Sequence, residues 1–318
     1  MAYTTIDNPE LYFQAKTYAG NSGTQSITLD GDEDMQPDFV WIKARSDGGE
    51  HTLYDSVRGA TKRLDSADYG AEDTVTNGVT AFNSDGFSLG AGGNENSASS
   101  IIAWCWKESA TAGFDIVSYT GNATNRTISH SLSAVPHLII IKNRSSGDSW
   151  CVGSHQLGTK DWTDYLQLET TGAFIDDAEV WNDTAPTSSV FSVGTDNNSN
   201  RNTSNFITYL FTEKQGFSKF GGYTGNGNVD GTFVYTGFRP AFLMIKVTDR
   251  TGEWNIFDTT RKTFNVGDLR LEPNSSSAED SHAVNYHDIL SNGFKMRNTD
   301  DPRNASGNSY IYMAFAEA

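Results

Sequence analysis

Short apolar runs of strand length, separated by polar turns, recur along the whole chain. The connecting segments are rich in Asn, Ser, Thr, Asp and Gly, the residue types that turns and hairpins favour. Apolar residues at the helical spacing i, i+3, i+4 and i+7 are nowhere sustained over three turns, and the best short examples are residues 9–14 and 55–64. This pattern predicts an all-β protein.

Three phrases of the same form divide the chain. Each consists of a proline, an apolar run and a lysine, and they lie roughly 100 residues apart, at residues 37–43, 136–142 and 240–246. A Tyr-x-Gly-Asn turn precedes each phrase, at residues 18–21, 119–122 and 223–226. An aromatic-rich segment ending in glutamate closes each repeat, at residues 101–108, 206–213 and 310–317. We therefore predict three units that share one topology, comprising residues 1–110, 111–214 and 215–318.

The apolar runs predict the principal strands of these units, at residues 39–43, 101–107, 138–142, 206–212, 241–246 and 310–316. Nearly every position in the runs is apolar, which indicates burial on both faces. The expected fold class is therefore all-β, with three tandem β-sandwich repeats of the jelly-roll or lectin-like type. The glycine and asparagine of each Tyr-x-Gly-Asn turn are expected to tolerate positive φ, as a hairpin turn requires.

The three repeats have diverged unevenly. Residues 54–58 (YDSVR) of the first unit have a counterpart in residues 257–261 (FDTTR) of the third, whereas the second offers residues 153–155 (GSH). One interpretation is a short helix or turn held by a local Asp–Arg pair. The other is a contact that the first and third units make and the second does not.

Composition narrows the classes of function. The formal net charge of −17 repels phosphate backbones and no Lys/Arg-rich block offsets it, so we expect no nucleic-acid partner. No apolar run is long enough to cross a membrane, and residues 1–7 lack the features of a signal peptide, so we expect synthesis in the cytoplasm without membrane insertion. Cys105 and Cys151 lie at non-equivalent places in different units, and both are expected in the core.

Motifs of catalysis are missing from the sequence. The six histidines, His51, His130, His137, His155, His282 and His287, form no HExxH pair, and we assign them structural or surface roles. No nucleophile elbow or phosphate-binding loop occurs, and the acids lie mainly in polar connectors. We therefore expect a protein that is not an enzyme and carries no cofactor, with glycan depolymerisation as a remote alternative.

Calcium is the one metal that the acidic residues suggest. Asp30, Asp32 and Asp34 alternate along one connector, but Met35 and Trp41 occupy the positions where an EF-hand loop needs glycine and glutamate. We therefore predict no metal site, and leave open whether calcium binds near these three aspartates.

Two groups of residues are candidates for binding. Trp162, Trp181 and Trp254 lie beside polar loops, where an exposed ring stacks on a sugar or a partner protein; burial in the core is the alternative. The apolar piece Leu11, Tyr12 and Phe13 precedes the first repeated phrase. It docks either onto a neighbouring molecule or onto its own first unit.

The repeated phrases also resemble a known group of proteins. Residues 37–43, 54–59, 82–87 and 103–107, together with 119–122, 142–145 and 235–240, are similar to an uncharacterised domain family of marine tailed bacteriophages. That family is found among virion structural proteins and is often labelled tail fibre or tail protein. The resemblance covers essentially the whole chain and brings no catalytic or ligand motif with it.

The resemblance implies a virion structural protein, most simply a tail-associated or fibre-type appendage. Its partners would be other virion proteins, further copies of itself in a homo-oligomer with a preference for a trimer, and a host cell-surface glycan or protein. A capsid decoration (cement) protein is the alternative, because no coiled-coil or collagen-like stalk is present in the sequence.

Overall fold

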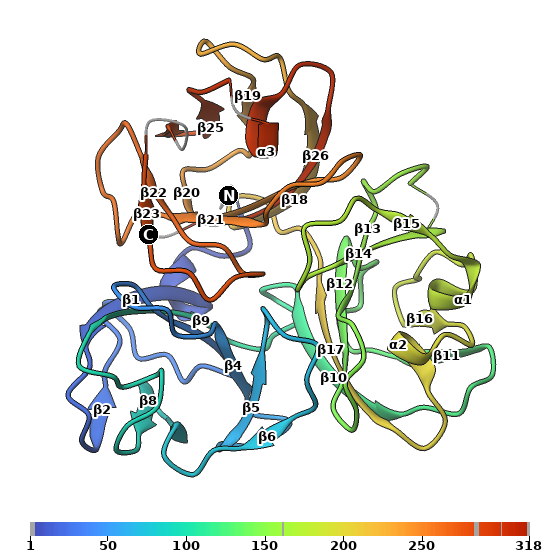
Figure 1. The fold of residues 1–318 in the computed structure, drawn as a ribbon, viewed down its shortest axis with the longest axis horizontal. Coiled ribbons are helices and arrows are strands. Elements are labelled where there is room, and N and C mark those ends of the chain that lie inside the picture. Colours follow the sequence, from blue (N-terminus) through green and yellow to red (C-terminus); the bar gives the residue numbers. More distant parts are fainter. Residues whose placement is uncertain (1–3, 161, 283–285, 300, 317–318) are drawn as a thin grey trace.

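The fold is nearly all β, with 41% of residues in strands and 5% in helices. A computed structural model describes residues 4–160, 162–282, 286–299 and 301–316. Figure 1 shows three β-rich units arranged around a common centre. The all-β fold class that the sequence predicts is confirmed, and the six predicted strands agree with observed strands to within one or two residues at either end.

Each unit contributes one main antiparallel sheet, and the strand order recurs among the three sheets. In the first sheet the order is β1 (Phe13–Ala19), β9 (Ser100–Trp106), β3 (Phe39–Ala44), β4 (Thr52–Asp55), β5 (Lys62–Asp65) and β6 (Asp73–Thr74). In the second it is β10 (Phe114–Thr120), β17 (Asn205–Phe211), β12 (Leu138–Asn143), β13 (Cys151–Ser154), β14 (Asp164–Gln167) and β15 (Ile175–Asp176). In the third it is β18 (Ser218–Thr224), β26 (Ser309–Ala316), β20 (Pro240–Val247) and β21 (Asn255–Asp258).

Smaller sheets and short helices cover the outer face of each main sheet. The small sheets comprise β2 (Gln25–Ile27), β8 (Gly86–Leu89) and β7 (Val79–Asn83); β11 (Arg126–Ser129) and β16 (Val190–Val193); and β19 (Phe233–Tyr235), β25 (Gly293–Met296) and β24 (His287–Leu290). A further pair, β22 (Leu269–Arg270) with β23 (Asp280–Ser281), continues the third main sheet, because Leu271 bridges to Ile256 of β21. The helices are η1 (Pro9–Leu11), α1 (Ala178–Trp181), α2 (Asn197–Asn200) and α3 (Asp301–Asn304).

Alternation along the main strands separates two kinds of core. On β3, Phe39 and Trp41 enter a central core, whereas Val40 and Ile42 enter a core that belongs to the first unit alone. Strands β12 and β20 divide their side chains in the same way. Because successive side chains of a strand point to opposite faces, a sheet with a core on each side needs an apolar residue at every position. The prediction of burial on both faces is confirmed.

The central core receives side chains from all three units. Phe39 and Tyr209 have ring centroids 4.5 Å apart, and Phe211 and Phe315 are 6.0 Å apart, so the first, second and third main sheets meet there. The units therefore form a closed ring around a shared core, to which all three main sheets contribute side chains (Figure 1).

The apolar N-terminal piece packs within its own chain. Phe13 is fully buried in the central core and its ring centroid lies 5.9 Å from that of Phe242 and 5.4 Å from that of Phe315, both of the third unit. Tyr12 makes an edge contact with Phe217, and Leu11 is half-buried. Phe13 also contacts Trp106 of the first unit, with ring centroids 5.1 Å apart, so the piece packs onto the first and third units together and not onto the first unit alone. The buried Phe13 side chain is not exposed for docking onto a neighbour.

The Tyr-x-Gly-Asn turns serve a different purpose from the one expected. The residue in the left-handed region is the one after the asparagine, at Ser22 (φ 55°), Ala123 (φ 53°) and Gly227 (φ 64°). The glycines themselves are needed for space: a Cβ at Gly20 or Gly121 would collide with the carbonyl oxygen of Ser97 or Arg201. The expectation of positive φ at the glycine and asparagine was therefore wrong.

A buried asparagine explains this close approach. The Asn122 amide donates to Asn200 Oδ1 at 3.0 Å, and the Asn200 amide group donates in turn to the carbonyl oxygens of Thr124 (2.8 Å) and Gly194 (2.6 Å). Asn96 and Asn304 have equivalent bonds in the other two units. A fully buried side chain thus holds each turn against the sheet.

Candidate functional site

Three contact regions between consecutive units repeat the same lysine contact. We call these regions seams: seam 1–2, seam 2–3 and seam 3–1, each named by the units it joins. A buried lysine at the end of a main strand donates to a carbonyl oxygen of the preceding unit, with bonds from Lys142 to Tyr69 (3.0 Å), from Lys246 to Gly172 (2.8 Å) and from Lys43 to Ser276 (3.3 Å). Burial lowers the pKa of all three ammonium groups to about 8.

A ring nitrogen reinforces two of the seams. Trp150 Nε1 donates to the Asp65 carbonyl at 3.1 Å in seam 1–2, and Trp254 Nε1 donates to the Gln167 carbonyl at 3.0 Å in seam 2–3. Both indoles are buried. The equivalent position in the first unit is His51, where burial lowers the imidazole pKa well below its usual value.

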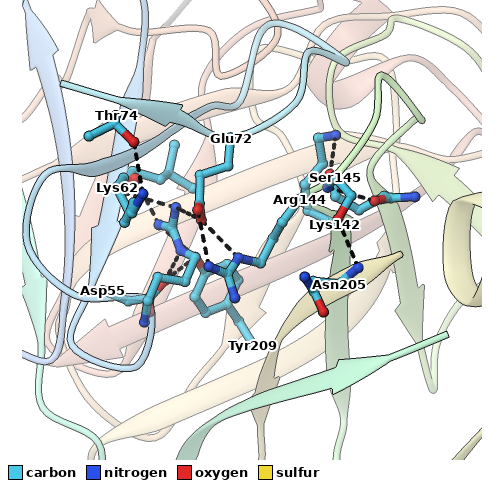
Figure 2. Close-up of polar contacts among 12 residues, drawn as sticks. Asp55, Lys62, Glu72, Thr74, Lys142, Arg144, Ser145, Asn205 and Tyr209 are labelled. Atoms are coloured by element: carbon cyan, nitrogen blue, oxygen red, sulfur yellow. Dashed lines mark hydrogen bonds and ion pairs between the residues drawn. The ribbon is translucent and has the colours of Figure 1, made fainter. Parts of the chain in front are cut away.

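Seam 1–2 contains a buried cluster of ion pairs. Figure 2 shows Glu72 between Arg144 and the group around Asp55. Arg58 pairs with Asp55 and contacts Glu72 at 3.4 Å, while Arg144 of the second unit binds both Glu72 oxygens at 2.8 and 3.0 Å. Burial by itself lowers the pKa of Arg58, but Asp55 and Tyr209 beside it outweigh that effect and raise it above its ordinary value. The charges are therefore paired across the boundary.

Seam 3–1 contains the same cluster built from equivalent residues. Arg261 pairs with Asp258 and binds Glu279 at 2.8 Å, and Arg45 of the first unit binds the two Glu279 oxygens at 2.7 and 3.0 Å. Trp104 Nε1 donates to Asp258 at 3.0 Å. Both interpretations of the Asp–Arg phrases thus hold. Each aspartate and arginine form a local pair, and the pair also contacts the following unit at seams 1–2 and 3–1, a contact that the second unit does not make with the third.

Seam 2–3 lacks the cluster at every equivalent position. Ser154, Leu157 and Phe174 replace the aspartate, arginine and glutamate of the other seams, and Thr248 and Met313 of the third unit take the positions of Arg144 and Tyr209. The backbone contact is retained, since the Phe174 amide donates to the Thr248 carbonyl at 2.8 Å, as Glu72 does to Arg144 at 2.9 Å. The seam therefore keeps its geometry without the buried charges.

A cavity of about 450 Å³ opens at seam 2–3. Its lining mixes charged groups, hydroxyls and ring edges, and it includes Lys160, Asp176 and Asp249 with Phe174, Tyr223 and Tyr310. Carboxylates and hydroxyl groups of this kind hydrogen-bond to polyhydroxylated ligands, and aromatic residues supply apolar contact. Seam 2–3 is the candidate binding site.

Two histidines and a glutamate gather beside this seam. Their ligand atoms, from His137, His155 and Glu213, lie within 4.8 Å of one another, and the two imidazole rings make an edge contact at 4.6 Å. Lys219 of β18 pairs with Glu213 at 3.0 Å. Burial lowers the pKa of both imidazoles, so they are neutral at pH 7.

Comparison with known proteins identifies one family. Residues 8–318 match the model of the family described as domain of unknown function DUF7483. The chain belongs to this family. No curated protein and no solved structure matches it.

The tryptophans proposed as binding residues are buried in this DUF7483 chain. Trp162 and Trp181 pack edge-to-face at 5.6 Å in the core of the second unit, and Trp181 Nε1 donates to the Asp164 carbonyl at 3.1 Å. Trp254 lies in seam 2–3. The side chains point inward, so no ring face is left for a sugar. The polar loops that flank these residues in the sequence led to the expectation of exposed rings. Core packing, the alternative, is what the structure has.

The aspartates considered for calcium are not brought together in the DUF7483 chain. Asp30 pairs with Lys16, and the Asp32 amide donates to Glu10 at 2.9 Å. Within the described residues, the histidine–glutamate cluster is the arrangement that could hold a metal. No sequence motif indicates this cluster, although His137 and His155 immediately flank β12 and β13, which pair antiparallel. Among those same residues, no helix is both long and apolar enough to span a membrane.

Proposed function

We propose that this chain is a structural component of a bacteriophage virion, a tail-associated or fibre-type appendage that contacts the host surface or other virion proteins. The observation that supports this most is the closed ring, in which three units share one core and buried lysines tie each seam. Such a body offers a large rigid surface. Catalysis is not part of the proposal, and neither is a membrane or nucleic-acid partner.

Seam 2–3 is the proposed contact with a cell-surface glycan. Its cavity combines carboxylates, a lysine and threonine hydroxyls with aromatic residues, the groups from which sugar sites are commonly built. We propose further that the three units are diverged copies of one β-sandwich, and that the protein is mounted as a homo-oligomer, with a trimer preferred.

A capsid decoration protein is the second candidate. The pseudo-threefold arrangement of the units favours it, because a single chain with three similar faces matches a threefold position on a shell (Figure 1). A remote third alternative, glycan depolymerisation, has no observation in its favour.

Particle reconstruction tests the proposed location. Density for this chain at the tail supports the appendage, and density on the capsid shell supports decoration instead. Absence of the chain from purified virions contradicts both.

A glycan-binding assay tests the proposed contact. Asp176→Asn, in the cavity, is expected to weaken binding of host surface polysaccharide at least about tenfold, because a hydrogen bond to a charged acceptor is worth about 1.5–3 kcal/mol. Asp73→Asn, on the corresponding edge of the first unit, is the matched control and should change nothing. Equal effects of the two substitutions would remove seam 2–3 as the site.

A further inference from the structure

We propose that His137, His155 and Glu213 form a zinc-binding site next to seam 2–3. Two imidazoles and a carboxylate are a ligand set that Zn²⁺ accepts, with a water molecule completing a tetrahedron. The inference is independent of the proposed virion function, since it concerns a cation that holds the fold.

The backbone places the two histidines opposite each other. His137 immediately precedes β12 and His155 immediately follows β13, and the His155 amide donates to the His137 carbonyl at 3.1 Å. The same backbone bond joins Ser56 to Asp38 in the first unit and Thr259 to Ala241 in the third. The scaffold is therefore common to all units, and only the second places imidazoles on it.

Hydrogen bonds fix the orientation of both rings. His155 Nδ1 lies 3.1 Å from the His137 carbonyl oxygen, which can only accept, so Nδ1 carries the proton and Nε2 keeps its lone pair. His137 Nδ1 accepts from the Glu213 amide at 3.2 Å and lies 3.1 Å from Thr212 Oγ1. In this arrangement the neutral His137 ring carries its proton on Nε2. Binding a metal ion through Nε2 would move that proton to Nδ1, from which the Thr212 hydroxyl can accept a hydrogen bond, because this hydroxyl already donates to the Val135 carbonyl at 2.9 Å.

Glu213 provides the third ligand from a different strand. It follows β17, and the Phe220 amide donates to its Oε1 at 3.3 Å while Lys219 pairs with its Oε2 at 3.0 Å. A carboxylate has about four acceptor positions, so these two bonds leave room for an ion. Lys219 opposes a cation by charge, but its side chain is 37% exposed and is free to turn toward solvent on binding.

The site lies next to seam 2–3, the seam without the buried ion-pair cluster. Glu213 lies in the connection from β17 to β18, Lys219 lies at the start of β18, and the neighbouring Gln156 lines the cavity together with Gly222 of β18. A bound ion would join the β12–β13 corner to this connection. Zinc would thereby stabilise the seam in which Ser154, Leu157 and Phe174 replace the buried ion pairs.

Metal titration of the full chain, free of any oligohistidine tag, tests the proposal. Calorimetry with ZnCl₂ should give one ion per chain, and CoCl₂ should give the visible absorption of a low-coordinate nitrogen and oxygen site. His155→Gln and His137→Gln should each abolish the Co²⁺ spectrum, and Glu213→Gln should weaken Zn²⁺ binding at least about tenfold. His282→Ala, at an exposed histidine in the third unit, is the matched control and should leave binding unchanged.

The wild-type titration decides the question even if a variant does not fold. Absence of binding at micromolar Zn²⁺, or more than one weak ion per chain, contradicts the proposal. So does a Co²⁺ spectrum that survives in a folded His137→Gln or His155→Gln protein.

Discussion

The Tyr209 hydroxyl of the second unit donates a 2.8 Å hydrogen bond to the Asp55 carboxylate of the first. Seam 3–1 reproduces this relationship with a different donor, since Trp104 Nε1 donates to Asp258 at 3.0 Å. At seam 2–3 the donor position holds Met313 and the acceptor position Ser154. A hydrogen-bond donor is thus present in each seam that has a buried aspartate and absent from the seam that has none. This is expected because burying a carboxylate without a hydrogen-bond partner costs folding free energy.

Arg58→Leu is expected to destabilise the protein by about 3–5 kcal/mol, because it leaves the Asp55 carboxylate buried without its counter-charge. Chemical denaturation at pH 7, followed by tryptophan fluorescence, measures the loss. The double substitution Asp55→Ser with Arg58→Leu copies Ser154 and Leu157 and should recover part of it. A double variant less stable than Arg58→Leu would contradict the account of the cluster.

Asn200→Asp is expected to cost about 2–3 kcal/mol, since a carboxylate cannot donate to the Thr124 and Gly194 carbonyl oxygens. Denaturant midpoints for this variant and for Asn198→Asp, on the same short helix, give the comparison. Asn198 is half-exposed, and its substitution should matter much less.

Lys142→Met is expected to lower the free energy of unfolding by about 2 kcal/mol, despite removing a buried charge. Its Nζ donates to the carbonyl oxygens of Tyr69, Asn143 and Asp148 at 2.8 to 3.0 Å, and methionine leaves all three without this donor. The control is Lys262→Met, which removes a surface lysine that pairs with Asp268 at 3.0 Å. Thermal denaturation of both variants makes the comparison, and Lys262→Met should change the thermal midpoint little. Equal shifts for the two variants would show that the lysine contacts do not stabilise the seams.

Glu108 should make stability fall as pH rises. Burial, aided by a hydrogen bond to Asp115, raises the pKa of Glu108 from 4.5 to about 7. The folded state therefore keeps a proton that the unfolded chain has lost, so the stabilisation is complete below about pH 4.5 and disappears as pH rises through 7. Denaturation at a series of pH values between these limits should give a flatter profile for Glu108→Gln than for the wild type. Parallel profiles would contradict the assignment.

The sequence predicted the strands but not what their inner faces contact. Runs such as residues 138–141 are apolar at every position, which indicates two buried faces; a sandwich and a shared central core satisfy that pattern equally well. Only the contact of Phe39 with Tyr209, whose rings belong to different units, shows that the inner faces of the main sheets meet in a shared core. Contacts between distant segments leave no periodic signal in a single sequence.

The site residues were hidden for different reasons. His137 and His155 are 18 positions apart, and only the pairing of β12 with β13 makes them neighbours. Asn200 is fully buried, yet one asparagine among many in an Asn-rich chain looks like a turn residue. Trp162 and Trp181 were misjudged because a polar loop on either side says nothing about the direction of a side chain.

The closed ring of three units in one polypeptide has a consequence for how the protein can evolve. In a ring of three identical chains, any substitution appears at every interface, and the assembly falls apart on dilution. Covalent connection makes closure intramolecular and independent of protein concentration. Each interface can then acquire substitutions that the other two do not share. Two interfaces can keep the contacts that hold the ring together while the third changes and gains the ability to bind a ligand.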